Sequence, residues 1–131
     1  TYVAAATKVQ VENNTVKVLE MHTAIDVGVA VTPDRVIAQM EGAMVFGLTI
    51  TLMGGITVKD GKVTESNFHD SPATRIHQSP PMFVHIVESD LPPGGVGEPG
   101  VPPIIPSITN AIYHACGKRI RELPVNQHMS V

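Results

Sequence analysis

Residues 8–19 have the sequence KVQVENNTVKVL, in which apolar and polar residues alternate on either side of two asparagines. Alternation with a period of two is typical of a β-strand that buries one face. Asn13-Asn14 favours a tight turn between the two halves, because asparagine adopts positive φ at little cost. The stretch therefore predicts a β-hairpin.

A helix is predicted to follow this hairpin. Residues 21–31 keep a strand-like mixture of apolar and small residues, and the signals change together at Thr32-Pro33-Asp34. The threonine can cap a helix, the proline suits its first position and the aspartate favours the positive end of its dipole. Apolar or small residues then recur at helical spacing as far as Leu48. Glycine in a helix costs about 1 kcal/mol relative to alanine, so Gly42 and Gly47 indicate close packing or a cofactor.

A second hairpin and a further strand are predicted in the middle of the chain. Asp60-Gly61 favours a type I′ turn, and short β-prone segments flank it at 56–58 and 62–64. Residues 66–81 are polar and end in two prolines, which predicts an ordered loop. The alternating segment 83–87 predicts a strand after that loop.

The stretch from Pro92 to Pro106 is rich in proline and glycine, with six of the eleven prolines and four of the eleven glycines. Valine and isoleucine are interleaved with them, so we expect a stiff, ordered loop and not a flexible linker. A helix is predicted from Ser107 to Cys116, with Gly117 at its end and Cys116 as a small core residue. The last ten residues are expected to form a frayed tail.

The predicted fold class is α+β, with β-hairpins and a mixed sheet packed against two helices. Strands and helices alternate too irregularly for a doubly wound parallel sheet. A length of 131 residues fits one domain, covering residues 1–131. No initiator methionine, basic segment or cleavage site stands at Thr1, so we expect the chain to be a fragment of a longer polypeptide.

The charge balance excludes some classes of partner. Nine basic and twelve acidic residues give a net charge of −3, so we expect no nucleic acid and no anionic membrane to be attracted. Charged residues make up only 16% of the chain, well below the roughly 25% of an average soluble domain. Part of the surface is therefore expected to be covered by something outside the chain, and the isolated chain is expected to self-associate through an exposed apolar face.

Glu98 is the candidate catalytic residue. It is the only carboxylate between Asp90 and Lys118, and it lies in the stiff sequence VGEPG, residues 96–100. A lone carboxylate in an apolar, rigid loop is a candidate general base, because burial makes a carboxylate more basic. A solvent-exposed loop glutamate, or one that accepts N–H bonds in its own turn, would have the same local sequence.

Other polar residues carry weaker signals. Gln39 precedes the small residues Gly42 and Ala43, so it could hydrogen-bond a ligand or lie on an ordinary solvated helix face. The consecutive N–H groups of the glycine-rich loop suit an anion, although no Walker A or GxGxxG motif is present. The six histidines have no metal-site spacing, so no protein-ligated metal is predicted; His69-Asp70 with His77 is the nearest approach.

The ordered set of motifs resembles the C-terminal end of the molybdenum-binding subunit of the xanthine dehydrogenase and aldehyde oxidase family, and the isoquinoline 1-oxidoreductase branch is the most similar. The resemblance covers nearly the whole chain. It is carried by residues 94–104, 110–112 and 117–124, and upstream by residues 26–28, 31–33, 39–43, Gly47, 66–68 and Arg75.

This resemblance implies a molybdenum hydroxylase, which adds oxygen from water to an aldehyde or an N-heterocycle. It implies that Glu98 is the general base, that Gln39 lies near the cofactor and that Gly95, Val96 and Gly97 bring the backbone close to it. The cofactor implied is molybdopterin in its cytosine dinucleotide form, with molybdenum held by the pterin dithiolene and by no protein ligand.

The implied partners are the remainder of the molybdenum-binding subunit and a small iron–sulfur subunit that carries 2Fe-2S clusters. The chain alone lacks the other cofactor-binding segments, so we expect it to be inactive by itself. Two other hypotheses stay open: a non-catalytic structural or interaction domain that retains the family sequence, and an anion-binding module that uses the glycine-rich loop.

Overall fold

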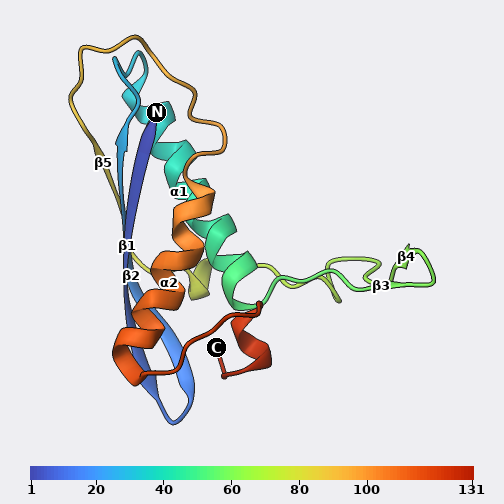
Figure 1. Ribbon diagram of the computed structural model, residues 1–131. Helices are drawn as coiled ribbons and strands as arrows, with labels where there is room; N and C mark the ends of the chain where they lie inside the picture. The colour runs from blue at the N-terminus through green and yellow to red at the C-terminus, as the bar shows by residue number, and fades with distance from the viewer.

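The computed structural model describes all 131 residues, and it consists of a three-stranded sheet with two helices on one face (Figure 1). The strand order is β1-β2-β5, with β1 antiparallel and β5 parallel to the central β2, so the sheet is mixed as predicted. The α+β class is confirmed. The main elements are β1 (Tyr2–Glu12), β2 (Thr15–Asp26), α1 (Pro33–Leu52), β5 (Met82–Ile86) and α2 (Val101–Cys116). The minor elements are β3 (Val58–Lys59), β4 (Lys62–Val63) and the 3-10 helices η1 (Ile76–Gln78) and η2 (Val125–Gln127).

The β1–β2 hairpin turns where the asparagines predicted it. Asn13 and Asn14 have φ of 49° and 61°, the left-handed conformation that a two-residue turn requires. The hairpin is longer than its clearest sequence pattern, since β1 begins at Tyr2 and β2 continues to Asp26. The strand-like stretch predicted to continue to Val31 therefore ends five residues earlier.

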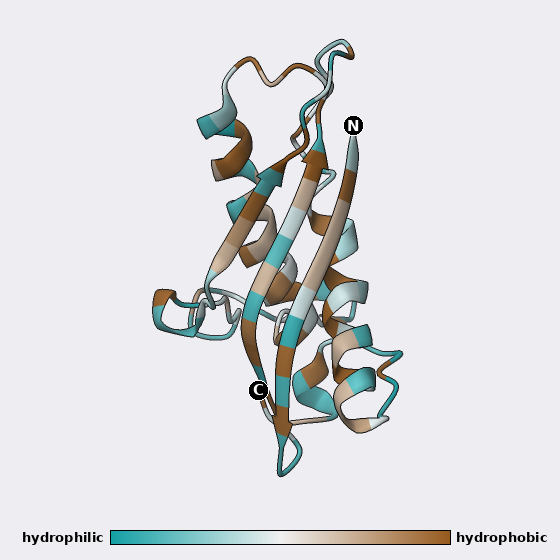
Figure 2. Cartoon of the chain, turned by 90° about the vertical axis from the view of Figure 1, so that its left-hand side faces the viewer, coloured by the Kyte–Doolittle hydropathy of each residue, from teal (hydrophilic) through white to brown (hydrophobic).

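The core lies between the sheet and the two helices. Both helices cover the same face of the sheet, and the opposite face is open, as Figure 2 shows. Where the helices meet, Gly47 of α1 has no room for a side chain: a Cβ there would lie 2.7 Å from Cβ of Ile104 on α2. The main cluster consists of Val16, Met21, Met44, Leu48, Leu52, Ile104, Ile108, Ile112, Ile120, Val125 and Met129.

Helix α2 begins six residues before the predicted start at Ser107. Two prolines, Pro102 and Pro103, occupy its first turn, where the missing N–H groups need no intrahelical partner. The predicted end is confirmed, because Gly117 has φ of 74° and its N–H donates to the carbonyl of Tyr113. Helix α1 begins as predicted at Pro33. The backbone carbonyl of Thr32 accepts the N–H groups of Arg35 and Val36, but the side chain of Thr32 does not cap the helix.

The last ten residues are packed and not frayed. Val125 and Met129 are buried in the main core. Ser130 is tied to the β-hairpin, since its carbonyl accepts from Val16 N–H at 2.8 Å and its N–H donates to the carbonyl of Asn14. The prediction for Cys116 is also wrong, because that cysteine is exposed.

Residues 55–73 project from this body as an arm, which carries the second predicted hairpin at its tip (Figure 1). Asp60 and Gly61 form the turn with φ of 51° and 72°, as a type I′ turn requires. Neither helix of the chain is both long enough and apolar enough to cross a membrane.

Candidate active site at the start of helix α2

The loop that carries Glu98 leads directly into α2 and lies against α1. The side-chain amide of Gln39, on the second turn of α1, donates through Nε2 to the carbonyl oxygen of Gly97 at 2.7 Å. This hydrogen bond joins residues 58 positions apart. Gly100 is buried against α1, where a Cβ would lie 2.7 Å from that of Ala43. Two of the residues singled out in the sequence, Gln39 and Gly97, are therefore in direct contact.

A cavity of about 670 Å³ opens between α1, the loop and the first turns of α2. Glu98 lies in its wall and is exposed, so of the two alternatives that the sequence left open, a buried base and a solvent-exposed loop glutamate, this chain has the exposed one. The chain positions the carboxylate beside a cavity and leaves it open to water. The lining residues are Gln39, Gly42, Ala43, Phe46, Gly97, Glu98, Val101, Pro102 and Ile105.

Two glycines keep this cavity free. A Cβ added at Gly42 or Gly97 would meet no atom within 4 Å, and both residues line the cavity. Gly47, one turn further along α1, differs because its missing side chain makes room for Ile104. The glycines of α1 therefore serve two purposes, and the helical cost of Gly42 has no packing explanation within the chain.

The backbone of the loop offers hydrogen-bond donors beside the cavity. The N–H groups of residues 95–98 find no backbone acceptor in the chain. The positive end of the α2 dipole lies at the same place, because the helix begins three residues after Glu98. This part of the site is suited to a polar or negatively charged ligand group.

Gly95 and Val96 lie beside the cavity and not in its wall. The carbonyl of Gly95 accepts from Thr1 Oγ1 at 2.7 Å, and Val96 packs against the small apolar cluster that includes Ile25 and Met40. The structure thus brings together Glu98, Gln39 and Gly97, and it places the other two predicted cofactor residues at the edge.

Sequence reasoning missed part of the cavity wall, above all Phe46. Phe46 lies four residues after Gly42, so the two share one face of α1, and this spacing was visible in the sequence. Val101, Pro102 and Ile105 were missed because the start of α2 was predicted too late.

The histidines lie in separate parts of the structure, apart from one pair on the sheet. His22 and His85 stack on each other on neighbouring strands, with ring centroids 5.7 Å apart. His69 lies on the arm, with Nε2 at 3.6 Å from an oxygen of Asp70. No group of three His, Cys, Asp or Glu side chains is arranged to hold a metal ion.

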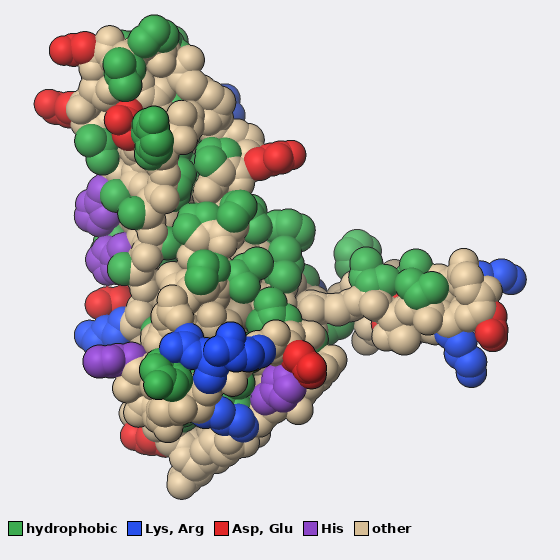
Figure 3. Space-filling view, in the orientation of Figure 1, with side chains coloured by type: hydrophobic (Ala, Val, Ile, Leu, Met, Phe, Trp, Pro, Cys, Tyr) green, Lys and Arg blue, Asp and Glu red, His purple; other side chains and the backbone are tan.

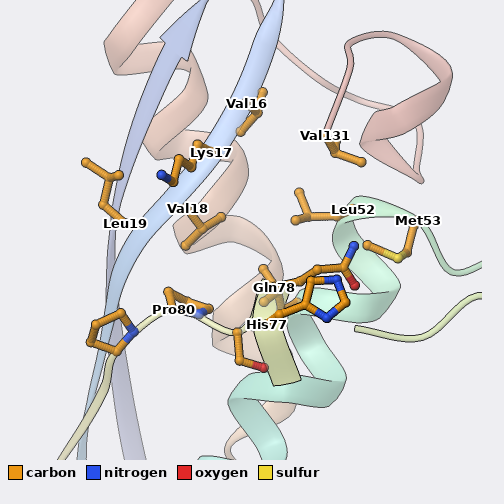
Figure 4. Close-up of a pocket in the computed structure, with 13 residues that line it drawn as sticks. Val16, Lys17, Val18, Leu19, Leu52, Met53, His77, Gln78, Pro80 and Val131 are labelled. Carbon is orange, nitrogen blue, oxygen red and sulfur yellow. The ribbon is translucent and has the colours of Figure 1, made fainter. Parts of the chain in front are cut away.

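A different cavity, of about 480 Å³, lies between β2, the end of α1 and η1 (Figure 4). Its lining includes Lys17, His77 and Gln78, and it contains no acidic side chain. None of the site residues predicted from the sequence lies there. The cavity beside Glu98 is therefore the better candidate for chemistry.

Comparisons with known proteins identify the family of the chain and agree with its fold. Residues 1–80 match the molybdopterin cofactor-binding domain family, a range that includes Gln39 and ends before Glu98. The isoquinoline 1-oxidoreductase subunit beta of Brevundimonas diminuta is 42% identical over 112 residues, which cover 86% of this chain and 14% of that protein.

Two further comparisons cover a similar share. A membrane-bound aldehyde dehydrogenase [pyrroloquinoline-quinone] of Gluconacetobacter polyoxogenes is 37% identical over 101 residues, which cover 77% of this chain and 13% of that protein. The crystal structure of quinoline 2-oxidoreductase from Pseudomonas putida 86 superimposes with a TM-score of 0.74 at 20% identity, over 89% of this chain and 16% of that one.

The chain spans only about one seventh of the length of these relatives. The family match extends over more than half of the chain, and the resemblance inferred from the sequence motifs is confirmed. The open cavity with its glycine floor and loop donors thus lies in a chain that belongs to the molybdopterin cofactor-binding domain family.

Proposed function

We propose that this chain forms the part of a molybdenum hydroxylase that places its general base, Glu98, beside the cofactor. The reaction is the hydroxylation of an aldehyde or an N-heterocycle with oxygen from water. The observation that carries the proposal is the position of Glu98 in the wall of a cavity that two glycines keep open next to Gln39.

The residues around this cavity fit molybdopterin. Gly42 and Gly97 leave space where any side chain would intrude. The free N–H groups of residues 95–98 and the start of α2 suit the polar and anionic parts of such a cofactor. When bound, the molybdenum cofactor supplies a centre that accepts the two electrons of the oxidation. In such a cofactor the pterin would hold the metal, so this chain would need to bind the pterin and not the metal itself.

Glu98 has the chemistry of a proton acceptor at this place. Its carboxylate would accept the proton of the water-derived oxygen as that oxygen bonds to the substrate carbon. The hydrogen of the broken C–H bond would leave that carbon with its two electrons, for which the bound cofactor would be the acceptor. A positioned general base typically contributes about 10² to 10⁴ in rate. Pro99 follows it and limits the backbone, while the bond from Gln39 to Gly97 fixes the preceding residue. The contribution of Gln39 is therefore both to bind the cofactor and to hold the loop.

The substrate class rests on two of the relatives. One relative is named for isoquinoline, an N-heterocycle, and the other for aldehydes. The aldehyde relative is also named for pyrroloquinoline quinone, whereas the family match of this chain names molybdopterin, and we assign molybdopterin for that reason.

The proposal extends to the form of the cofactor and to the partners of the chain. The molybdopterin is assigned as its cytosine dinucleotide form. The partners are the remainder of the molybdenum-binding subunit and a small iron–sulfur subunit that carries 2Fe-2S clusters.

The competing hypothesis is a non-catalytic structural or interaction domain that retains the family sequence. The exposure of Glu98 in this chain is the observation that favours it. The two hypotheses differ in what an assembled complex contains and does, so one experiment separates them.

The test is a complex formed by co-expressing this chain with the remaining segments of the molybdenum-binding subunit and the iron–sulfur subunit. We expect the purified complex to contain molybdenum by mass spectrometry and to oxidise isoquinoline or benzaldehyde. Glu98→Gln should keep the molybdenum and lower turnover by about 10² to 10⁴.

Glu88→Gln is the matched control, because it removes a carboxylate that is also exposed but does not line the cavity. It should leave turnover unchanged. A complex without molybdenum, or a Glu98→Gln complex with undiminished turnover, would contradict the proposal.

A further inference from the structure

All three phenylalanines of the chain are exposed, although phenylalanine is one of the residues most often buried in proteins. Phe46 on α1 is 58% exposed and Phe68 on the arm is 84% exposed. These two line one hollow of about 820 Å³ between α1 and the arm, together with Val45, Ile50 and Ile56. Figure 3 shows hydrophobic side chains on the adjoining sides of the body and the arm. We name this hollow the corner surface.

The corner surface is continuous with the cavity beside Glu98. Gly42 and Phe46 line both hollows, so an occupant of the first lies at the border of the second. No charged residue lines the corner surface. Lys59, Asp60 and Lys62 belong to the β3–β4 hairpin at the tip of the arm, where Figure 3 shows charged side chains. The corner surface is therefore suited to an apolar occupant.

Local hydrogen bonds hold the arm in place in the absence of any core. Thr74 donates its N–H to Thr49 Oγ1 at 3.1 Å, which fastens the base of the arm to α1. Glu65 accepts from Thr57 N–H at 2.8 Å, which closes the base of the hairpin. A two-stranded hairpin alone is marginally stable in water, so these bonds matter more here than within a sheet.

The turn that presents Phe68 is held by several local hydrogen bonds. Asp70 accepts N–H bonds from Ser66 at 2.8 Å and from Asn67 at 2.9 Å. Phe68 donates its own N–H to Asn67 Oδ1 at 2.8 Å. An exposed aromatic side chain on a fixed turn resembles the anchor residues of protein interfaces, which lose little entropy on binding.

We propose that the corner surface is the docking site for an apolar segment of the remaining part of the molybdenum-binding subunit, with Phe68 and Phe46 as anchors. The chain spans 14% of its isoquinoline-oxidising relative, so most of such a subunit lies outside it. The occupant would also border the cavity beside Glu98, since Gly42 and Phe46 line both hollows. This inference rests on the proposed function and specifies where the partner segment lies.

The test uses the co-expressed complex with Phe68→Asp, and Phe83→Asp as the matched control. Phe83 is also exposed, but it lies on β5 and lines neither hollow. We expect Phe68→Asp to weaken association with the remaining segments by about tenfold or more, measured by titration of the purified parts, because it places a charge in an apolar contact. Hydrogen exchange of residues 55–73 should slow in the wild-type complex and not in the variant.

The outcomes separate this inference from the proposed function. A complex that holds molybdenum and assembles equally well with Phe68→Asp overturns the docking site and leaves the function standing. A complex that lacks molybdenum, but is weakened by Phe68→Asp alone, supports the docking site and contradicts the function. Equal weakening by both variants, or protection of the corner surface by a second copy of this chain alone, overturns the docking site.

Discussion

The body of the molecule and its arm use apolar residues in opposite ways. In the body, Ile104, Ile108 and Ile112 of α2 are fully buried against the sheet and α1. On the arm, Ile56 and Phe68 are 74% and 84% exposed, and the backbone is held by hydrogen bonds to Glu65, Asp70 and Thr49. The body is stabilised by burial within the chain, whereas the arm is ordered by local polar contacts.

This difference shows which surfaces of the chain are complete. An apolar residue that is buried within the chain stabilises the fold. An apolar residue that is exposed on a fixed turn contributes free energy only when a partner covers it. Substitutions in the two regions should therefore separate, with changes in the body altering unfolding and changes in the arm altering assembly.

The largest effect is expected from Ile108→Ala in the body. Ile108 is fully buried, so its loss should lower the free energy of unfolding by about 2–5 kcal/mol. Ile56→Ala on the arm is the matched control, and it should change that free energy by less than about 0.5 kcal/mol. Urea unfolding followed by circular dichroism measures both. Similar losses for the two variants would show that the arm is buried in the isolated chain.

A smaller effect is expected from the two glycines of α1. Gly47→Ala forces a Cβ to within 2.7 Å of Ile104 and should cost about 1–3 kcal/mol. Gly42→Ala has free space around it and should stabilise the helix by up to about 1 kcal/mol. In the assembled complex we expect Gly42→Ala to be the more harmful of the two variants. The methyl group at position 42 enters the cavity and should lower the molybdenum content of the complex. Unfolding and metal analysis on both variants would settle whether the cavity is occupied.

The smallest effect is expected from acid on the arm. N–H bonds from Asn67 and Ser66 hold the pKa of Asp70 below its ordinary value of 3.8, and a bond from Thr57 lowers the pKa of Glu65 from 4.5. The pKa of each carboxyl is lower in the folded arm than in the unfolded chain. The hydrogen bonds to the carboxylates therefore stabilise the folded arm at a pH above the ordinary pKa values, and this stabilisation is lost as the pH falls through the lowered pKa values.

Both carboxylates are solvent-exposed, so acid should loosen the arm without unfolding the body. Amide chemical shifts of Ser66 and Asn67 should move as the pH falls from about 5 to about 2, and Asp70→Asn should abolish that movement. Body amides that shift together with them would contradict the independence of the two regions.

Local sequence signals predicted most of the fold. Asn13-Asn14, Pro33 and Gly117 each require a particular backbone conformation, and each marks the turn, helix start or helix end that it predicted. The start of α2 was predicted too late, because Pro102 and Pro103 were interpreted as part of a loop. Both prolines are tolerated in the first turn of a helix, which is where the structure places them. The packing of Val125 and Met129 depends on long-range contacts with the body, which no local pattern contains.

The candidate site was only partly predictable. Glu98, Gln39 and Gly97 were identified from motifs, and the structure brings them to one cavity. Phe46 was missed because an apolar residue at helical spacing usually belongs to the core, and only the three-dimensional structure shows that it lies outside it. The sequence left open whether Glu98 is buried or exposed, since the sequence of a stiff apolar loop does not tell which of its faces is covered.

The parallel pairing of β2 with β5 has a consequence for how the chain reaches its structure. Residues 27–81 separate the two strands and contain all of α1 and the arm. Closing so long a segment costs chain entropy before the strand contacts offset it. We therefore expect the β1–β2 hairpin to form within microseconds and β5 to join last, so that the slow kinetic phase of refolding reports on the strand that leads to Glu98.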